Sequence, residues 1–369
     1  MESQNLLIKN GIIAECKSVP YSAHDLLQMM RGAYTTARST LNGKAVFEFA
    51  FHIHRLIYTS LKMLQHFKSN LNANTDEFAQ EEGHYPLKDL FQLESFTQTI
   101  REMTKAGIEK LKDFYQFKDE NLEFKITLVI VFPNRYSYPE SINRESIQDS
   151  SSKYNIYLHL CPMPNTPKTI HVDVHPGSRF HWGNVKDTYW AIERSQLGHK
   201  KLKTSNEVIM CEEDGSLREG ISSNFFAILK SNGKTQTANE GVLIGSTRAA
   251  VIPGPVEDSL DLKLETDMNT LLNQDQYEIT APNLANLLEF EEVFITSTTR
   301  LLLPIKQMNI AKECIHSILP KEKAELLLNS GKLQETDSYY VCQFSTVRGE
   351  ELSQQLISTL VSKSTILSE

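Results

Sequence analysis

Lys186 stands among aromatic and apolar residues in the sequence. Both tryptophans of the chain, Trp182 and Trp190, lie within four residues of it, and Phe180 and Tyr189 are also near. An ammonium group in apolar surroundings loses its proton more easily, and the neutral amine is a nucleophile toward carbonyl carbon. The segment therefore indicates either a reactive amine or, as for most lysines, a solvated surface charge.

A carboxylate with short polar neighbours follows Lys186 along the chain. Glu219 ends a polar stretch just before an apolar strand-like segment, and Gly220 permits a close backbone approach. A carboxylate fixed at the start of a strand can face a basic nitrogen of a cofactor. The alternative is an exposed glutamate in an ordinary hairpin.

Two apolar segments end in runs of hydroxyl residues. Residues 241–244 run into Gly245, Ser246 and Thr247, and Phe294 and Ile295 run into residues 296–299. Hydroxyls and free backbone N–H groups at such positions can hold an anion, although capped turns have the same composition. No lysine follows the glycine, so this is not a nucleotide-binding P-loop.

Arg55 lies near the start of a predicted helix and could face the same anion, or be a surface charge. Together the segments contain one lysine, one carboxylate, two hydroxyl clusters and an arginine. A lysine that binds an aldehyde, a carboxylate for a ring nitrogen and polar groups for a phosphate are what pyridoxal phosphate requires.

The same segments carry a family resemblance. Residues 52–56 match an HLxRL motif, residues 219–226 match EGxxSNFF, and residues 245–248 match GITR. In these motifs and their order the chain resembles the class IV (fold type IV) pyridoxal-phosphate aminotransferases. That family includes branched-chain aminotransferases, D-amino acid aminotransferases and aminodeoxychorismate lyase.

The resemblance implies roles for particular residues. It implies that Lys186 binds the pyridoxal phosphate covalently and acts as the catalytic residue, and that Glu219 pairs with the ring nitrogen. The remaining cofactor-binding residues that it implies are Arg55, Ser223, Asn224, Ser246, Thr247, Ser297 and Thr298.

The substrate side departs from the family pattern. Where the family reads GVFET-R, this chain has Thr35 in place of the usual glutamate, within residues 32–38. Tyr34 is expected to line the substrate pocket, and Arg38 and Arg300 are candidates for holding a carboxylate. Tyr189 is a candidate for the phenolic oxygen of the cofactor.

The predicted function is transfer of an amino group between an amino acid and a 2-oxo acid. An aminodeoxychorismate lyase-like reaction and a non-catalytic protein of the same fold remain alternatives. His171, Asp173 and His175 alternate along a predicted strand and could bind a metal, but a polar strand face is favoured, and no metal is predicted. The resemblance also implies a homodimer.

The predicted fold class is mixed α/β in two domains. A smaller domain spans residues 1–162, a proline-rich linker spans 163–168, and a larger domain with the lysine spans 169–369; the cofactor lies in the cleft between them. Strands are predicted over residues 45–51, 124–132, 154–160, 169–175, 207–211, 224–229, 241–244, 293–297 and 338–344. A hairpin around Asp214 and Gly215 is predicted to join residues 207–211 to residues 224–229. Helices are predicted over residues 22–30, 53–67, 93–114, 185–197, 284–290 and 351–361.

Composition excludes several classes of partner. The net charge is −8, and no dense basic stripe is present, so nucleic acid and anionic membranes are not expected partners. The five cysteines are scattered without a CxxC pair, which favours a reducing compartment. With no signal peptide and no apolar run of about 20 residues, a cytoplasmic protein is expected.

Overall fold

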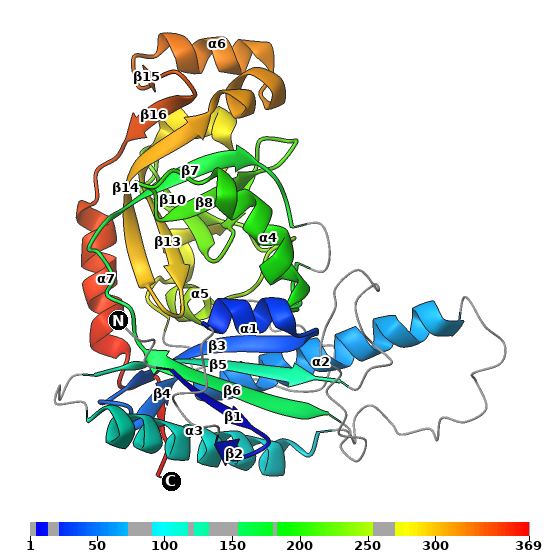
Figure 1. Cartoon of the computed structure of the whole chain (residues 1–369). Coiled ribbons are helices and arrows are strands. Elements are labelled where there is room, and N and C mark those ends of the chain that lie inside the picture. Colours follow the sequence, from blue (N-terminus) through cyan, green and yellow to red (C-terminus); the bar gives the residue numbers. More distant parts are fainter. Residues whose placement is uncertain are drawn as a thin grey trace.

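The strands form two sheets, one above the other in Figure 1. The computed structural model describes residues 5–13, 22–72, 91–116, 122–132, 154–179, 183–253 and 270–368. The seven strands of the lower sheet run in the order β17-β4-β3-β5-β6-β1-β2. Their bounds are β1 Leu6–Lys9, β2 Ile12–Ile13, β3 Gly32–Thr40, β4 Ala45–Phe47, β5 Phe124–Val131, β6 Asn155–Pro162 and β17 Ser364–Ile366.

Two long helices, α2 Phe49–Asn72 and α3 Leu93–Tyr115, pack against the lower sheet. Strand β5 shows how the sheet divides its faces. Ile126, Leu128 and Ile130 join the apolar cluster that contains residues of both helices. Because side chains alternate along a strand, Lys125 and Thr127 are placed on the other face, toward the upper sheet. The short helix α1 Ala23–Met29 lies on that side and is capped by Ser22.

The upper sheet closes on itself. This sheet has ten strands: nine follow the path β12-β11-β10-β9-β8-β7-β14-β16-β15, and the tenth, β13, pairs with both β10 and β14. Strands β7, β8, β9, β10, β13 and β14 therefore pair in a closed ring, which leaves none of these six as a free edge. The bounds are β7 Ile170–Pro176, β8 Glu207–Cys211, β9 Leu217–Gly220, β10 Asn224–Leu229, β11 Thr235–Thr237, β12 Tyr277–Ile279, β13 Phe290–Ser297, β14 Leu301–Ala311, β15 Gln334–Glu335 and β16 Tyr339–Gln343.

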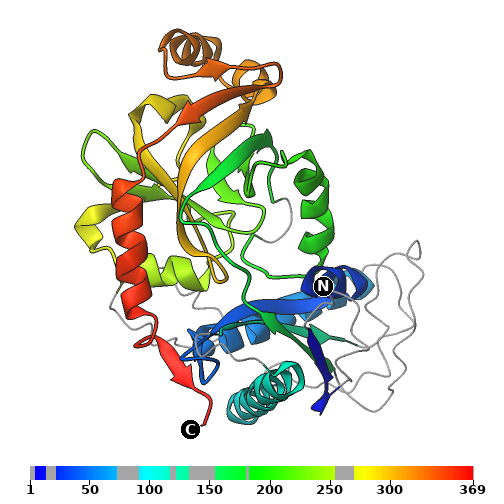
Figure 2. The same cartoon turned by 60° about the vertical axis from the view of Figure 1, so that its left-hand side comes forward.

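The helices of the second half lie around this ring. They are α4 Tyr189–Lys200, α5 Ser246–Val251, α6 Lys321–Asn329 and α7 Val347–Thr359, with shorter turns at Gln274–Gln276, Leu284–Glu289 and Cys314–Ile318. Figure 2 shows α7 running down beside the ring to the C-terminal strand. That strand, β17, pairs with β4 and so returns the end of the chain to the lower sheet.

The chain passes from the lower sheet to the upper sheet between β6 and β7, where the proline-rich segment lies in the sequence. Only β17 of the strands after the linker joins the lower sheet, among the residues that the structure describes. The division into domains at residues 163–168 stays a prediction. In the described part of the chain no helix combines the length and the apolar character that a membrane crossing requires.

Several predicted elements are confirmed and four are wrong. The strand predicted over residues 45–51 ends at Phe47, because α2 begins at Phe49. The hairpin at Asp214 and Gly215 joins β8 to β9 rather than to residues 224–229. Residues 241–244 form no strand. The helix predicted from residue 185 begins only at Tyr189, since the chain before it bonds to β3.

Candidate active site

A cavity of about 230 Å³ lies between the two halves of the structure. Residues of both halves line it. The first half contributes, among others, Tyr34, Thr36, Arg55, Lys125 and Thr127. The second contributes, among others, Arg179, Lys186, Trp190, Arg194, Glu219, Ser223, Asn224, Ser297 and Thr298.

Lys186 sits in an extended segment that bonds to the start of β3. Its carbonyl accepts from the Tyr34 N–H at 2.9 Å, and the Thr188 N–H donates to the Gly32 carbonyl at 2.9 Å. The Gly32 N–H in turn donates to the Thr188 hydroxyl at 3.0 Å. Gly32 has no room for a side chain, because a Cβ atom there would lie 2.1 Å from the Ile130 carbonyl oxygen. These bonds fix the backbone from which the lysine projects.

The Lys186 side chain is half-buried in the cavity wall, with other cations around it. Its Nζ lies 4.7 Å from the centroid of the Tyr34 ring. Burial lowers the pKa of Lys186 well below its ordinary value, and the charges of Arg55, Arg179 and Arg194 lower it further, against the opposing effect of Glu219. Burial and the neighbouring cations thus favour the neutral amine over the ammonium form. Trp182 lies outside the described residues.

Glu219 is the last residue but one of β9 and lines the same cavity. One oxygen of its carboxylate pairs with the Arg179 guanidinium at 3.4 Å, and the other accepts from the Leu243 N–H at 3.1 Å. Burial raises the pKa of Glu219, while Arg179 and the Leu243 N–H act to lower it. The tight turn after Glu219 needs Gly220, because a Cβ atom there would lie 2.5 Å from the Ser223 hydroxyl.

Arg55 reaches the cavity from α2 and is held by two polar neighbours. Its Nη2 donates to the Thr35 hydroxyl at 2.7 Å and lies 3.1 Å from Nδ1 of His52. Burial lowers the pKa of Arg55 to about 10. Thr35, which replaces the usual glutamate of the family, thus acts on Arg55 and does not line the cavity.

The two predicted hydroxyl clusters meet in space. The hydroxyls of Ser246 at the start of α5 and Thr298 after β13 are 2.9 Å apart. Thr298 and Ser297 line the cavity, whereas Ser246 and Thr247 lie directly behind the wall. Asn224 donates to the Leu243 carbonyl at 2.7 Å and so fixes the chain just before α5. Leu243 thus bonds to Glu219 and Asn224, which accounts for the absence of a strand over residues 241–244.

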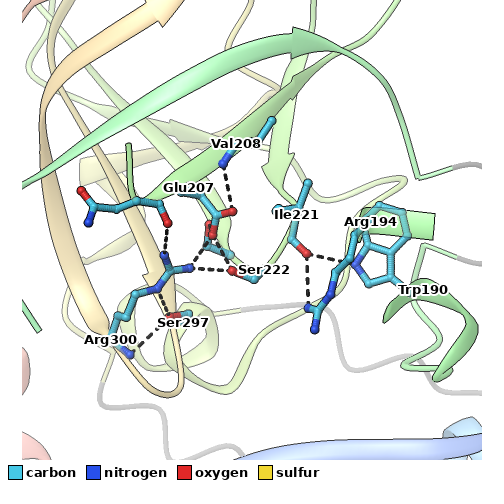
Figure 3. A network of polar contacts seen from close by, with 10 residues as sticks. Trp190, Arg194, Glu207, Val208, Ile221, Ser222, Ser297 and Arg300 are labelled. Carbon is cyan, nitrogen blue, oxygen red and sulfur yellow. Dashed lines mark hydrogen bonds and ion pairs between the residues drawn. The ribbon is translucent and has the colours of Figure 1, made fainter. Parts of the chain in front are cut away.

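The predicted substrate residue Arg300 does not line the cavity. Figure 3 shows it bound to the carboxylate of Glu207, and its Nη2 also donates to the Ser222 hydroxyl at 2.8 Å. Burial acts to raise the pKa of Glu207, but the pairing with Arg300 and the Ser222 hydroxyl outweighs it, so that pKa is lowered. Ser223 donates to the same carboxylate at 3.0 Å. Arg300 therefore belongs to an ion pair behind the cavity.

Three other predicted residues can be placed. Tyr34 lines the cavity beside Lys186, as predicted. Arg38 does not line it; its guanidinium approaches the carbonyl of the cavity residue Thr299 at 3.4 Å. Tyr189 is partly exposed and lies against Arg31, with 5.0 Å from the guanidinium carbon to the ring centroid. Tyr34, and not Tyr189, is the tyrosine next to the lysine.

Polar atoms in the cavity wall, and directly behind it at Thr247, are suited to pyridoxal phosphate. The Tyr34 hydroxyl, the Thr247 hydroxyl and Nε of Arg55 are buried without a hydrogen-bond partner among the described residues. Buried polar groups are normally satisfied, so each of these atoms is suited to a ligand or water partner. A phenol and phosphate oxygens are acceptors and donors of the required kind. The residues present therefore fit the cofactor that the sequence predicts.

The alternative metal site at β7 receives no support. The buried Asp173 carboxylate accepts from the Leu202 N–H at 2.6 Å, the Ser205 hydroxyl at 2.5 Å and the Asn309 amide at 2.8 Å. No group of three or more His, Cys, Asp and Glu side chains that could hold a metal ion occurs in the described ranges.

Sequence reasoning missed three cationic residues of the cavity. Arg179 comes seven residues before Lys186, in a segment with no periodic pattern. Arg194 follows Trp190 by one helical turn, so the two share a face of α4, a signal that the sequence contained. Lys125 alternates with Thr127 in a segment that otherwise resembles a fully buried strand. That alternation could have identified the polar face.

Comparisons with known proteins identify the family to which the chain belongs. The family model described as Amino-transferase class IV matches residues 32–308. Similar solved structures include a branched-chain aminotransferase from Thermoproteus uzoniensis with norvaline, at 14% identity and a TM-score of 0.56, covering 98% of this chain and 99% of that one. None of the curated proteins matches the sequence significantly.

Two further structures have the same TM-score of 0.56. A fold IV transaminase from Curtobacterium pusillum is 13% identical, with 98% of each chain covered. A hypothetical aminotransferase from Mycobacterium tuberculosis, in a PLP-bound form, is 12% identical and covers 97% of this chain and 99% of that one. At such identities these structures show the fold. With the family model spanning most of the sequence, the chain belongs to the class IV aminotransferases and has their mixed α/β fold.

Proposed function

We propose that the protein is a pyridoxal-phosphate-dependent aminotransferase that moves an amino group between an amino acid and a 2-oxo acid. The observation that carries the proposal is the placement of one half-buried lysine, one buried carboxylate and one buried arginine around a single cavity. Lys186 would bind the cofactor covalently, Glu219 would face its ring nitrogen, and Arg55 would hold its phosphate. The family assignment supports the same roles.

The proposed phosphate site is built from residues of several elements. Arg55, oriented by Thr35, supplies a charge, and Ser297 and Thr298 supply hydroxyls in the wall. Ser246 orients the Thr298 hydroxyl, and the unpaired Thr247 hydroxyl completes the set. Ser223 and Asn224 keep the turn after Glu219 in place. Several fixed contacts to one phosphate would set the tilt of the ring and present the substrate Cα–H bond to Lys186.

The chemistry of the residues follows from their protonation. When bound, the cofactor supplies an electron sink for the bonds at the substrate Cα. The pKa of Lys186 is lowered by burial and by neighbouring cations, so its amine could accept the proton from the substrate Cα. It could then donate that proton to a carbon of the bound cofactor. Glu219 can hold a proton at the ring nitrogen and so stabilise negative charge that develops at Cα. Arg179 opposes the effect of burial on the Glu219 carboxylate.

Assembly, compartment and reaction type are further parts of the proposal. We propose a homodimer in the cytoplasm, without nucleic-acid or membrane partners, on the family resemblance and the composition. A lyase reaction is the second candidate, because the Lys186 and Glu219 roles serve either outcome. The position of Thr35, away from the cavity, leaves the substrate side to be set by other residues.

Borohydride trapping and a half-reaction screen test the proposal. The protein is loaded with pyridoxal phosphate, reduced and digested, and the labelled peptide is expected to contain Lys186. The loaded protein is then mixed with a panel of L- and D-amino acids while the absorbance of the lysine-bound cofactor is followed. An aminotransferase converts the cofactor to pyridoxamine phosphate and releases a 2-oxo acid. Label on another lysine refutes the site.

Product analysis separates the candidate reactions. A lyase releases its product and leaves the cofactor in the lysine-bound form after each turnover. If no amino acid discharges the bound cofactor, the aminotransferase assignment fails. Lys186→Ala is the control variant, and it should show neither trapping nor discharge.

A further inference from the structure

Two short segments that line the cavity are tied together behind its wall. Residues 221–223 join β9 to β10, residues 298–300 join β13 to β14, and each segment contributes to the lining. Arg300 of the second segment pairs with Glu207 at the start of β8, and the two side chains are only 18% and 1% exposed (Figure 3). Glu207 in turn bonds to the first segment through two serine hydroxyls. The two segments therefore share one buried ion pair.

Arg300 reaches four acceptors with its guanidinium. Nη2 donates to the Glu207 carboxylate and, at 2.8 Å, to the Ser222 hydroxyl. Nη1 donates to the Asn206 carbonyl at 3.4 Å, and Nε donates to the Ser297 hydroxyl at 3.2 Å. Because the guanidinium is planar and rigid, the bonds at Nη1 and Nη2 fix the direction in which Nε points.

The Ser297 hydroxyl receives two hydrogen bonds from the same residue. The Arg300 backbone N–H donates to Ser297 Oγ at 3.3 Å, and Nε of Arg300 donates to it at 3.2 Å. A serine hydroxyl has two acceptor lone pairs and one hydrogen, so both lone pairs are occupied. Among the residues that the structure describes, nothing accepts that hydrogen, and Ser297 lines the cavity. The hydroxyl is therefore left as a donor for an acceptor inside the cavity.

Glu207 fixes Arg300 from behind. Its side chain is almost fully buried, and one oxygen accepts from the Val208 N–H at 3.0 Å. The other oxygen accepts from the hydroxyls of Ser222 at 2.5 Å and Ser223 at 3.0 Å, as well as from Arg300. A buried carboxylate bonded at both oxygens is costly to move, because a shift would leave buried polar groups unpaired. Arg300 thus has a fixed partner that keeps its guanidinium behind the cavity wall.

We propose that Arg300, anchored by Glu207, is a positioning residue that holds the Ser297 hydroxyl as a donor to the cofactor phosphate. This rests on the proposed function, in which Ser297 is one of the phosphate-binding residues. Arg300 itself does not line the cavity, so it acts through Ser297 rather than on the ligand. A phosphate dianion offers acceptors and no donor, so a hydroxyl whose lone pairs are already occupied suits it. The guanidinium also polarises the hydroxyl and strengthens the bond that it donates.

The test compares two cofactor forms that differ in the phosphate alone. The full-length protein, freed of cofactor, is titrated with pyridoxal phosphate and with pyridoxal, and the absorbance of the lysine-bound form gives both dissociation constants. Their ratio is here called the phosphate preference. Ser297→Ala should lower this preference roughly tenfold, as expected for the loss of one charge-assisted hydrogen bond. Arg300→Lys, which keeps a cation beside Glu207 but has no Nε donor, should lower it several-fold and leave the affinity for pyridoxal unchanged.

A double-mutant cycle shows whether Arg300 acts through Ser297. The variant with both Arg300→Lys and Ser297→Ala should have the same phosphate preference as Ser297→Ala alone, because no hydroxyl then remains to be oriented. Glu207→Gln gives a second route, since loss of the anchoring charge should also lower the preference. Arg348→Lys is the matched control: its Nη1 donates to the Gly233 carbonyl at 2.6 Å, outside the cavity lining, and the preference should not change.

Three outcomes overturn the proposal. An unchanged phosphate preference in both Arg300→Lys and Glu207→Gln shows that the pair does not orient a phosphate-binding group. Equal weakening of pyridoxal phosphate and pyridoxal in these variants shows that the pair supports the pocket as a whole. Additive losses in the double variant show that Arg300 does not act through Ser297. Borohydride label on a lysine other than Lys186 refutes the proposed function, whereas loss of the phosphate preference in Arg300→Lys would still support the positioning role.

Discussion

The hydrogen bond between Thr35 and Arg55 allows a sharp test, because valine has nearly the same shape as threonine. The Thr35 hydroxyl is completely buried, 2.7 Å from Nη2 of Arg55 and 2.8 Å from Nδ1 of His52. Thr35→Val leaves the methyl packing intact and removes this polar link. Among the described residues, the Arg55 guanidinium then keeps one hydrogen-bond partner, His52. Its Nε already has none.

The size of the effect follows from the charge and burial of Arg55. A hydrogen bond to a charged group contributes about 1.5–3 kcal/mol, and a buried group left unsatisfied costs a similar amount. We therefore expect Thr35→Val to lower the free energy of unfolding by about 2–3 kcal/mol, which corresponds to a decrease in Tm of roughly 3–4 °C for a chain of this size. If Arg55 holds the cofactor phosphate, affinity for pyridoxal phosphate should fall about tenfold as well.

Thermal unfolding with and without pyridoxal phosphate measures both effects. Thr104→Val is the matched control, since Thr104 is equally buried but donates only to the Ile100 carbonyl within α3. It should cost less than about 1 kcal/mol and leave cofactor affinity unchanged. Equal losses in the two variants would refute the role of Thr35. An unchanged cofactor affinity in Thr35→Val, despite a lower Tm, would refute the assignment of Arg55 to the phosphate.

Three further predictions concern the lysine and its surroundings. Glu219→Gln should keep bound cofactor but reduce the rate of amino-group transfer by at least ~100-fold, measured by stopped-flow absorbance; a smaller loss would show that the ring nitrogen does not depend on this carboxylate. Gly32→Ala should lower the free energy of unfolding by at least about 2 kcal/mol, because its Cβ would lie 2.1 Å from the Ile130 carbonyl oxygen. Gly198→Ala in α4, whose nearest contact would be at 3.8 Å, is its control in denaturant titrations and should not destabilise. Folding lowers the pKa of Lys186, so below pH 10.5 the unfolded chain keeps a proton on this amine that the native protein has lost. The free energy of unfolding of the cofactor-free protein should therefore rise, relative to that of Lys186→Met, as the pH increases from about 7 to 10. If the Tm values of the two proteins changed equally with pH across that range, the pKa of Lys186 would not be lowered.

The chemistry-bearing centre could be predicted from sequence because its residues lie in short contiguous motifs. Lys186, Glu219 and Arg55 are each flanked by residues that mark them, and the structure brings all three to one cavity. The two hydroxyl clusters were each ambiguous alone, and only the fold shows that Ser246 and Thr298 touch.

The substrate side could not be predicted in the same way, because it depends on where each side chain ends in the folded molecule as well as on which face a strand turns inward. Arg38 and Lys125 are cross-strand partners on one face of β3 and β5, yet only Lys125 lines the cavity. Arg300 looks like a free cation in the sequence, and its partner Glu207 is 93 positions away along the chain. Pairings at such separations leave no local pattern.

Strand β14 was missed for a related reason. Pro304 interrupts its apolar run, and a proline in a segment normally argues against a central strand. In the structure the strand continues through Pro304 because its neighbours change along its length. It pairs with β13 up to Pro304 and with β7 and β16 beyond it.

The backbone bonds between β3 and the lysine segment limit how the molecule can move. Lys186 follows the proline-rich linker in the chain, yet its carbonyl and the N–H of Thr188 are bonded to the strand that begins at Gly32. A hinge motion that separates the two halves would break these bonds and displace the lysine itself. Movement of one half against the other is therefore coupled to movement of the lysine segment. A chain cleaved in the linker would keep its reactive amine in place only while the two fragments stay associated.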